Sequence, residues 1–257
     1  MKLFASALLL AALTYVCRAN TGTDDPPSVS FDTFPLPLTR TYVSAAAGTP
    51  VSKANLDDPF PNDFPPPAIT VALEDRRDYP ATKKGARYFF PGHNVLRVFR
   101  ISHVESAPYK TIQTDMASLR KLLADRPRTI PDDGEHSLPD YPPRNSAHAF
   151  QVNVTYLDAD WGSGICYVTQ FTQDGGTPAN NEELTYIFQG ISKDSNFYVS
   201  GDFRITHPKL PKGIDDTPHR AKGDYEADRI LLSKQSDASF TPSLAKLREW
   251  IKSLKIE

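Results

Sequence analysis

Residues 150–156 read Phe-Gln-Val-Asn-Val-Thr-Tyr, and this stretch decides the fold class. Apolar and polar residues alternate along it, a period of two that is typical of a strand with one buried face. The alternation predicts that Val152 and Val154 point inward and that Asn153 points toward water. Because half-buried strands of this kind belong mainly to antiparallel sheets, we predict an antiparallel sheet.

Strand and helix signals lie on both sides of this stretch. Polar turns at 158–164 and 193–196 separate apolar runs and predict two hairpins between residues 149 and 205. Apolar residues recur at helical spacing near the middle and at the end of the chain, where Thr241 is the expected cap. The chain is therefore predicted to be α+β, an antiparallel sheet packed against two amphipathic helices in a single domain over residues 67–257. Further strands are predicted at 68–73, 86–90 and 95–101, and the two helices at 110–124 and 241–254.

The first nineteen residues have the pattern of a secretory signal peptide. Lys2 precedes an apolar run over 3–16, and the small residues Cys17 and Ala19 suit a cleavage site. An alternative is a lipoprotein signal with Cys17 as the lipidated residue. The run is shorter than the roughly 20 residues that cross a bilayer, so we predict a secreted, extracellular protein with no transmembrane segment.

The prolines predict a loop region in the first part of the chain, and the net charge argues against one class of function. Most of the 23 prolines precede residue 144, and residues 20–66 are predicted to be a proline-rich loop region. The chain has 29 basic and 31 acidic residues, and removal of Lys2 and Arg18 with the signal leaves it more acidic. Such a balance lacks the positive footprint of a nucleic-acid-binding protein.

Sequence motifs for catalysis, cofactors or metals are missing. Cleavage leaves Cys166 as the single cysteine, in an apolar run that predicts a buried, inert thiol. Asp158 and Asp160 begin a spacing found in calcium loops, but Thr169 stands where the loop needs glutamate. We therefore predict no metal and no cofactor. Two function classes remain: a non-enzymatic binding or interaction protein, or a hydrolase or isomerase-like enzyme whose site comes from distant residues.

Residues 145–211 contain a block of short motifs. The motifs are Asn145-Ser146-Ala147, Gly162-Ser163-Gly164, Val168-Thr169-Gln170-Phe171, Asn180-Asn181-Glu182-Glu183-Leu184, Phe188-Gln189-Gly190 and His207-Pro208-Lys209-Leu210-Pro211. This block resembles an uncharacterised family of exported proteins and lipoproteins, mostly bacterial. The resemblance implies export and a fold, and no reaction.

Four residues in this block are candidates for a ligand surface. Gln173, Asn181 and Glu183 offer hydrogen-bonding groups, and Trp161 offers a flat apolar face. The partner would be a polar small molecule, a glycan or a protein. Alternatively, these side chains only satisfy backbone groups in turns. Asn153-Val154-Thr155 is a glycosylation sequon, with Asn153 as the acceptor.

Overall fold

The structure is a computed structural model, and it describes residues 27–31, 38–46, 67–75, 94–105, 110–130, 138–142, 144, 146–173, 178–213 and 225–257. The predicted signal peptide at 1–19 and the predicted strand at 86–90 lie outside these residues. The elements are β1 (Val29–Ser30), β2 (Leu38–Ala46), β3 (Ala68–Asp75), β4 (Val95–Arg100), α1 (Ile101–Glu105), α2 (Lys110–Asp125), β5 (Ala147–His148), β6 (Val152–Asp158), β7 (Gly162–Thr169), β8 (Phe171–Thr172), β9 (Thr185–Ser192), β10 (Phe197–Arg204), α3 (Glu226–Ser233), the 3-10 helix η4 (Asp237–Ser239), α4 (Leu244–Lys252) and β11 (Lys255–Ile256).

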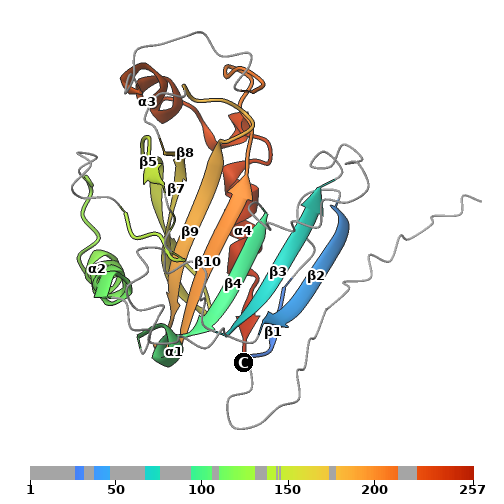
Figure 1. Ribbon diagram of the computed structural model, residues 1–257, viewed down its shortest axis with the longest axis vertical. Helices are drawn as coiled ribbons and strands as arrows, with labels where there is room; N and C mark the ends of the chain where they lie inside the picture. Colours follow the sequence, from blue (N-terminus) through green and yellow to red (C-terminus); the bar gives the residue numbers. More distant parts are fainter. Residues whose placement is uncertain are drawn as a thin grey trace, which may run out of the picture.

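The centre of the fold is one seven-stranded sheet in the order β2-β3-β4-β10-β9-β7-β6. All six pairings between its neighbours are antiparallel. Figure 1 shows the strands side by side, with helices packed around them. The α+β class and the antiparallel sheet are therefore confirmed. Within the described residues, no helix is long and apolar enough to cross a membrane.

Each face of the sheet carries its own hydrophobic core. On one face, α4 places Leu247 and Ile251 against strand residues that include Phe188. On the other face, α2 places Met116 and Leu119 against strand residues of β7 and β9. Strands covered on both faces bury nearly every side chain, which explains the unbroken burial of β9.

Three local predictions need correction. The predicted loop region at 20–66 contains β1 and also β2, which pairs with β3 along the edge of the sheet. Helix α3 is an element that the sequence analysis did not identify. The last helix is flanked at its start by Ser243 rather than Thr241, and Ser243 makes no side-chain capping bond. Local propensity misses β2 because a strand at a sheet edge depends on its partner more than on its own composition.

A bulge interrupts the alternation that predicted the sheet. Between Val152 and Thr155 the register of β6 against β7 shifts, and Asn153 adopts a left-handed backbone with φ of 55°. The extra residue turns the strand over, so Val152 packs in the core under α4 while Val154 packs on the α2 face. The prediction that both valines share one face is wrong.

The Gly162-Ser163-Gly164 motif is a strand start with tight packing. Gly164 lies opposite Gly190, and the ring of Phe188 lies against both. A Cβ at Gly164 would stand 2.4 Å from that ring. Glycine is needed at Gly164 because a side chain would have to occupy the space that the aromatic ring fills.

A short two-stranded ladder joins the two ends of the described chain. β1 pairs with β11, and Ser28 and Glu257 exchange two backbone hydrogen bonds of 2.9 and 3.1 Å. Phe31 then packs its ring edge-on against Trp250 of α4, with 5.4 Å between the centroids. The first described segment is thus fixed to the last helix.

Candidate functional site

Trp161, the aromatic member of the predicted ligand surface, is part of the core. Its side chain is 8% exposed, and its ring packs edge-on against Phe188. The indole Nε1 donates a 2.9 Å hydrogen bond to the carbonyl of Ile251 in α4. The ring therefore connects the β6–β7 turn to the last helix, and it offers no face to a ligand.

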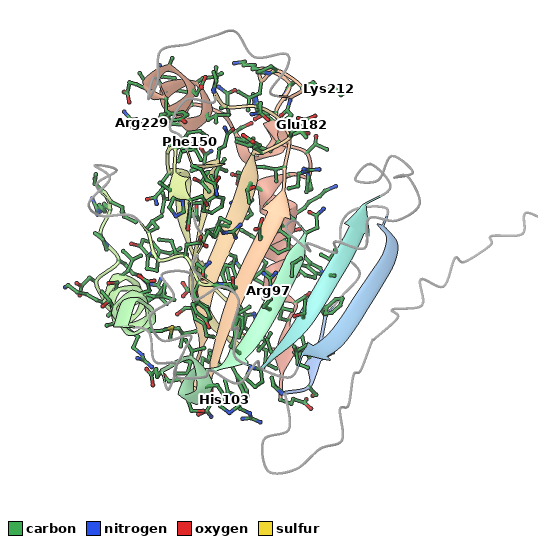
Figure 2. The ribbon with its side chains drawn as sticks, viewed as in Figure 1. Arg97, His103, Phe150, Glu182, Lys212 and Arg229 are labelled. Atoms are coloured by element: carbon green, nitrogen blue, oxygen red, sulfur yellow. The ribbon has the colours of Figure 1, made fainter. Side chains whose placement is uncertain are left out.

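The other three predicted residues lie at the opposite end of the sheet. The register pairs Gly162 with Ser192 and Thr169 with Thr185, so Trp161 lies a full strand length from Asn181 and Glu183. In Figure 2, Glu182, which lies between Asn181 and Glu183 in the sequence, is near one end of the sheet, and His103 of α1 is near the other.

Asn181 and Glu183 bond mainly to their own surroundings, while Gln173 is exposed just after β8. The Asn181 amide donates to two carbonyls and accepts from the backbone N–H of His207 at 2.7 Å. Glu183 accepts a bond from Asn180. The four residues do not converge on one cleft, and the amide of Asn181 satisfies a loop backbone instead.

Asn153, the predicted glycosylation acceptor, is half-buried beside the segment that follows α3. Its Nδ2 donates a 3.2 Å hydrogen bond to the carbonyl of Gln235. A glycan would have to attach to that same nitrogen. Glycosylation at Asn153 stays a prediction, but the bulge has turned the residue toward Gln235.

Cys166 lies in β7 with no exposed surface. Burial raises the pKa of its thiol to about 12, against a smaller opposite effect from Tyr186. A thiol that stays protonated is a poor nucleophile. The prediction of a buried thiol is confirmed.

A cluster of charges lies on the α2 face of the sheet. Arg144 is its centre, and its guanidinium contacts Asp140 at 3.0 Å and Asp202 of β10 at 2.6 Å. Arg97 of β4 faces the same carboxylates from the middle of the sheet (Figure 2). Gln189 of β9 donates a 3.2 Å bond to Asp140. We call these five residues the sheet-face cluster.

Burial changes the proton affinities in and beside the sheet-face cluster. It raises the pKa of Asp140 to about 6, with Arg144 opposing and Asp202 adding to the rise. Burial disfavours the Arg144 cation, but Asp202 and Asp140 outweigh that effect and raise its pKa. His148 lies nearby, and burial, followed by the charge of Arg144, lowers its pKa to about 4. An aspartate with such a pKa can exchange a proton near neutral pH.

Asp140 and Arg144 of the cluster belong to a strap, residues 138–142 and Arg144, which is bonded to the sheet at further points. Leu138 donates its N–H to Gln151, and the Tyr167 hydroxyl donates to the carbonyl of Pro139. The Asp140 and Asp202 side chains are only 10% and 3% exposed. The ion pair between Arg144 and Asp202 fastens the strap to β10, so the arrangement has a structural role.

An open pocket of about 530 Å³ lies at the α1 end of the sheet. This end pocket lies between the last turns of α2, the β6–β7 turn and the β9–β10 turn. Its size falls in the range of small-molecule sites. Its polar lining is Arg120, Arg126, Asp158, Ser163, Ser192, Lys193 and Ser195, with Leu123, Ala124, Ala159, Gly162 and Ile191 as the remainder.

Some polar groups of the end pocket are engaged and others are available. Arg120 pairs with Glu105, and Arg126 pairs with Asp158. Within the described part of the chain, the side chains of Ser163, Lys193 and Ser195 make no hydrogen bond or ion pair. The described residues contain no group of three acidic, histidine or cysteine side chains that would hold a metal ion. The end pocket is therefore suited to bind a polar molecule.

Sequence reasoning did not identify these pocket residues. Helical periodicity assigns Arg120 to a solvated face, and hairpin logic assigns Lys193 and Ser195 to a turn. Both interpretations are correct locally. Only the packing of α2 beside the two turns brings them together, and no spacing in the sequence records that packing.

Comparisons of the chain with models of protein families, with curated proteins and with solved structures find no match. The resemblance over residues 145–211 to exported proteins therefore stays a prediction.

Proposed function

We propose that this chain is a secreted, non-enzymatic binding protein that holds a small polar molecule in the end pocket. The observation that carries the proposal is the combination of size and chemistry in that pocket. It is open, has small-molecule volume, and presents hydroxyl and ammonium groups that have no partner among the described residues. Leu123 and Ile191 add apolar surface, which such sites use to bury the body of a ligand.

The composition of the end pocket favours binding over catalysis. General acid–base or nucleophilic chemistry needs a nucleophile beside a base of suitable pKa. No histidine or cysteine is among the described residues that line it, and Asp158 accepts two bonds from Arg126. These contacts hold the pKa of Asp158 below its ordinary value.

The alternative is a secreted hydrolase or isomerase-like enzyme that uses the sheet-face cluster. The observation in its favour is the pKa of about 6 for Asp140, next to Arg144. Perturbed carboxyl groups of this kind gather at catalytic sites and also in structural ion-pair networks. The burial of the Asp140 and Asp202 side chains favours the structural role.

A pair of tryptophan variants tests the binding function. Ala124→Trp places an indole in the end pocket from an exposed position of α2. Ala117→Trp makes the same change at an exposed position two turns earlier, outside the pocket. A panel of hydroxylated small molecules is tested by ligand-observed NMR. We expect saturable binding by wild type and Ala117→Trp, loss of binding by Ala124→Trp, and recovery of the compound unchanged. Equal binding by all three proteins, no binding at all, or conversion of the compound would contradict the proposal.

A further inference from the structure

We infer that the end pocket selects a small hydroxylated carboxylate, such as a sugar acid, and that Asp158 occupies the place of the ligand's carboxylate on Arg126. This inference rests on the proposed binding function and names the ligand class. The first observation is charge. Among the described lining residues, three side chains are basic and one is acidic, and they come from three separate elements of the fold. Arg120 is paired with Glu105 and Arg126 with Asp158, so the positive charge without a partner in the described part of the chain is that of Lys193, and this charge attracts anions.

Arg126 is presented as a carboxylate receptor. It follows the last residue of α2 in a left-handed conformation with φ of 44°, and its backbone N–H caps the helix by bonding to the carbonyl of Leu122. Its guanidinium lies over the ring of Tyr156, with 5.7 Å to the centroid. Backbone and ring together hold the guanidinium fork in one place, so less side-chain entropy is lost when an anion binds.

Asp158 already demonstrates the geometry that Arg126 accepts. Two guanidinium nitrogens donate to the two carboxylate oxygens, one of them at 2.8 Å. An arginine fork can hold a carboxylate or a phosphate by such a two-point contact, and here the group that it holds is a carboxylate. The Asp158 side chain is 64% exposed, and exposed ion pairs are weak. A ligand carboxylate can therefore replace Asp158 at small cost.

The other residues that line the end pocket indicate which groups the ligand carries besides its carboxylate. Lys193 supplies a second positive charge, and it has no carboxylate partner in the described part of the chain. The hydroxyls of Ser163 and Ser195 can each donate to and accept from a ligand hydroxyl. Leu123 and Ile191 offer an apolar patch of the kind that covers one face of a sugar ring. A hydroxylated carboxylate meets all three requirements.

Calorimetric titration of the full secreted protein tests the inference with three probes. Glucuronate carries the carboxylate and the hydroxyls, glucose lacks the charge, and inorganic phosphate is a tetrahedral anion. We expect glucuronate to bind more tightly than either control, with affinity that falls as salt is added. We expect Asp158→Asn to tighten glucuronate binding and Lys193→Gln to weaken it, each by about two- to fivefold, the size of an exposed charge interaction.

Lys212→Gln is the matched control for Lys193→Gln. Lys212 is exposed at the far end of the molecule from the end pocket (Figure 2), and its replacement should leave affinity unchanged. Equal affinity for glucose, equal affinity for phosphate, or weaker glucuronate binding by Asp158→Asn overturns the inference. If none of these probes binds while neutral compounds still bind in a manner sensitive to Ala124→Trp, the inference fails and the binding function stands. Absence of binding by every compound contradicts the binding function itself.

Discussion

The sheet-face cluster and the end pocket use the same residue types in opposite ways. In the cluster, Arg144 binds Asp140 and Asp202, and both carboxylates are almost fully buried. In the pocket, Arg126 binds Asp158 while both side chains keep 41% and 64% of their surface in water. Buried charges must find partners within the protein, whereas exposed charges can exchange partners with a ligand. The degree of burial therefore separates a structural ion pair from a binding one.

The two regions should also differ in how much stability is lost when one residue of the ion pair is replaced. Removal of one partner from a buried pair leaves an uncompensated charge in a poorly solvated place. Removal of one partner from an exposed pair leaves a charge that water solvates. Stability measurements should therefore respond to the sheet-face cluster, and binding measurements should respond to the end pocket.

Arg144→Met should give the largest effect. The change removes the guanidinium that Asp140 and Asp202 share and leaves Arg97 as the remaining cation that faces them. We expect the free energy of unfolding to fall by about 3 kcal/mol, the lower end of the range for a broken buried pair. Urea denaturation at neutral pH measures this loss. A decrease smaller than about 1 kcal/mol would mean that the cluster behaves like an exposed pair, and the contrast between the two regions would not hold.

The pH dependence of stability should be next in size. Burial raises the pKa of Asp140 from 3.8 to about 6, so the folded protein binds this proton more tightly than the unfolded chain. Stability from Asp140 is therefore present below pH 4 and decreases as pH rises through about 6, by at most about 3 kcal/mol. His148 has the opposite sign, since its lowered pKa favours the fold as pH rises.

The difference in unfolding free energy between wild type and Asp140→Asn isolates the contribution of Asp140, because His148 is common to both proteins. As pH rises from 4 to 6, the unfolding free energy of the wild type should decrease relative to that of Asp140→Asn. Asp158→Asn provides the contrast. The pKa of Asp158 is lowered by its bonds to Arg126, so its stabilising effect is lost as pH falls through and below 3.8. If the stability contributed by Asp140 and by Asp158 changed in the same direction with pH, the contrast between the two regions would not hold.

Arg126→Met should have the smallest effect on stability. The same substitution that damages the cluster at Arg144 here removes only an exposed ion pair, and we expect a loss below about 1 kcal/mol. Urea denaturation beside Arg144→Met gives a direct comparison of the two arginines. A loss as large as that of Arg144→Met would make Arg126 a structural residue and remove it from the binding site.

The sequence predicts the elements whose signals are local. The strand at 68–73, the helix at 110–124 and the hairpin that turns at 193–196 all appear close to their predicted bounds. The bulge at Asn153 was not predictable from alternation, because alternation assumes a regular strand. The edge strand β2 depends on its pairing with β3, a contact that no local pattern encodes.

The candidate site was less predictable than the fold for a related reason. Polar residues in turns were expected to face a ligand, yet Asn181 bonds to the backbone around His207. The residues that do line the end pocket come from the end of a helix and from two hairpin turns. Arg126, Ser163 and Lys193 are examples. Their proximity follows from where α2 packs on the sheet, and it is a property of the tertiary structure.

The β1–β11 ladder has a mechanical consequence. Ser28 and Glu257 form the outermost pair of an antiparallel ladder, and Ser30 and Lys255 form the innermost one. A force that pulls residues 28 and 257 apart acts on the outermost bonds first, and it opens the ladder one pair after another, as a zipper opens. Little tension is needed for such peeling, since the bonds do not share the load. Side-chain packing first resists extension at Val29, which is buried in the core, and then at the contact between Phe31 and Trp250.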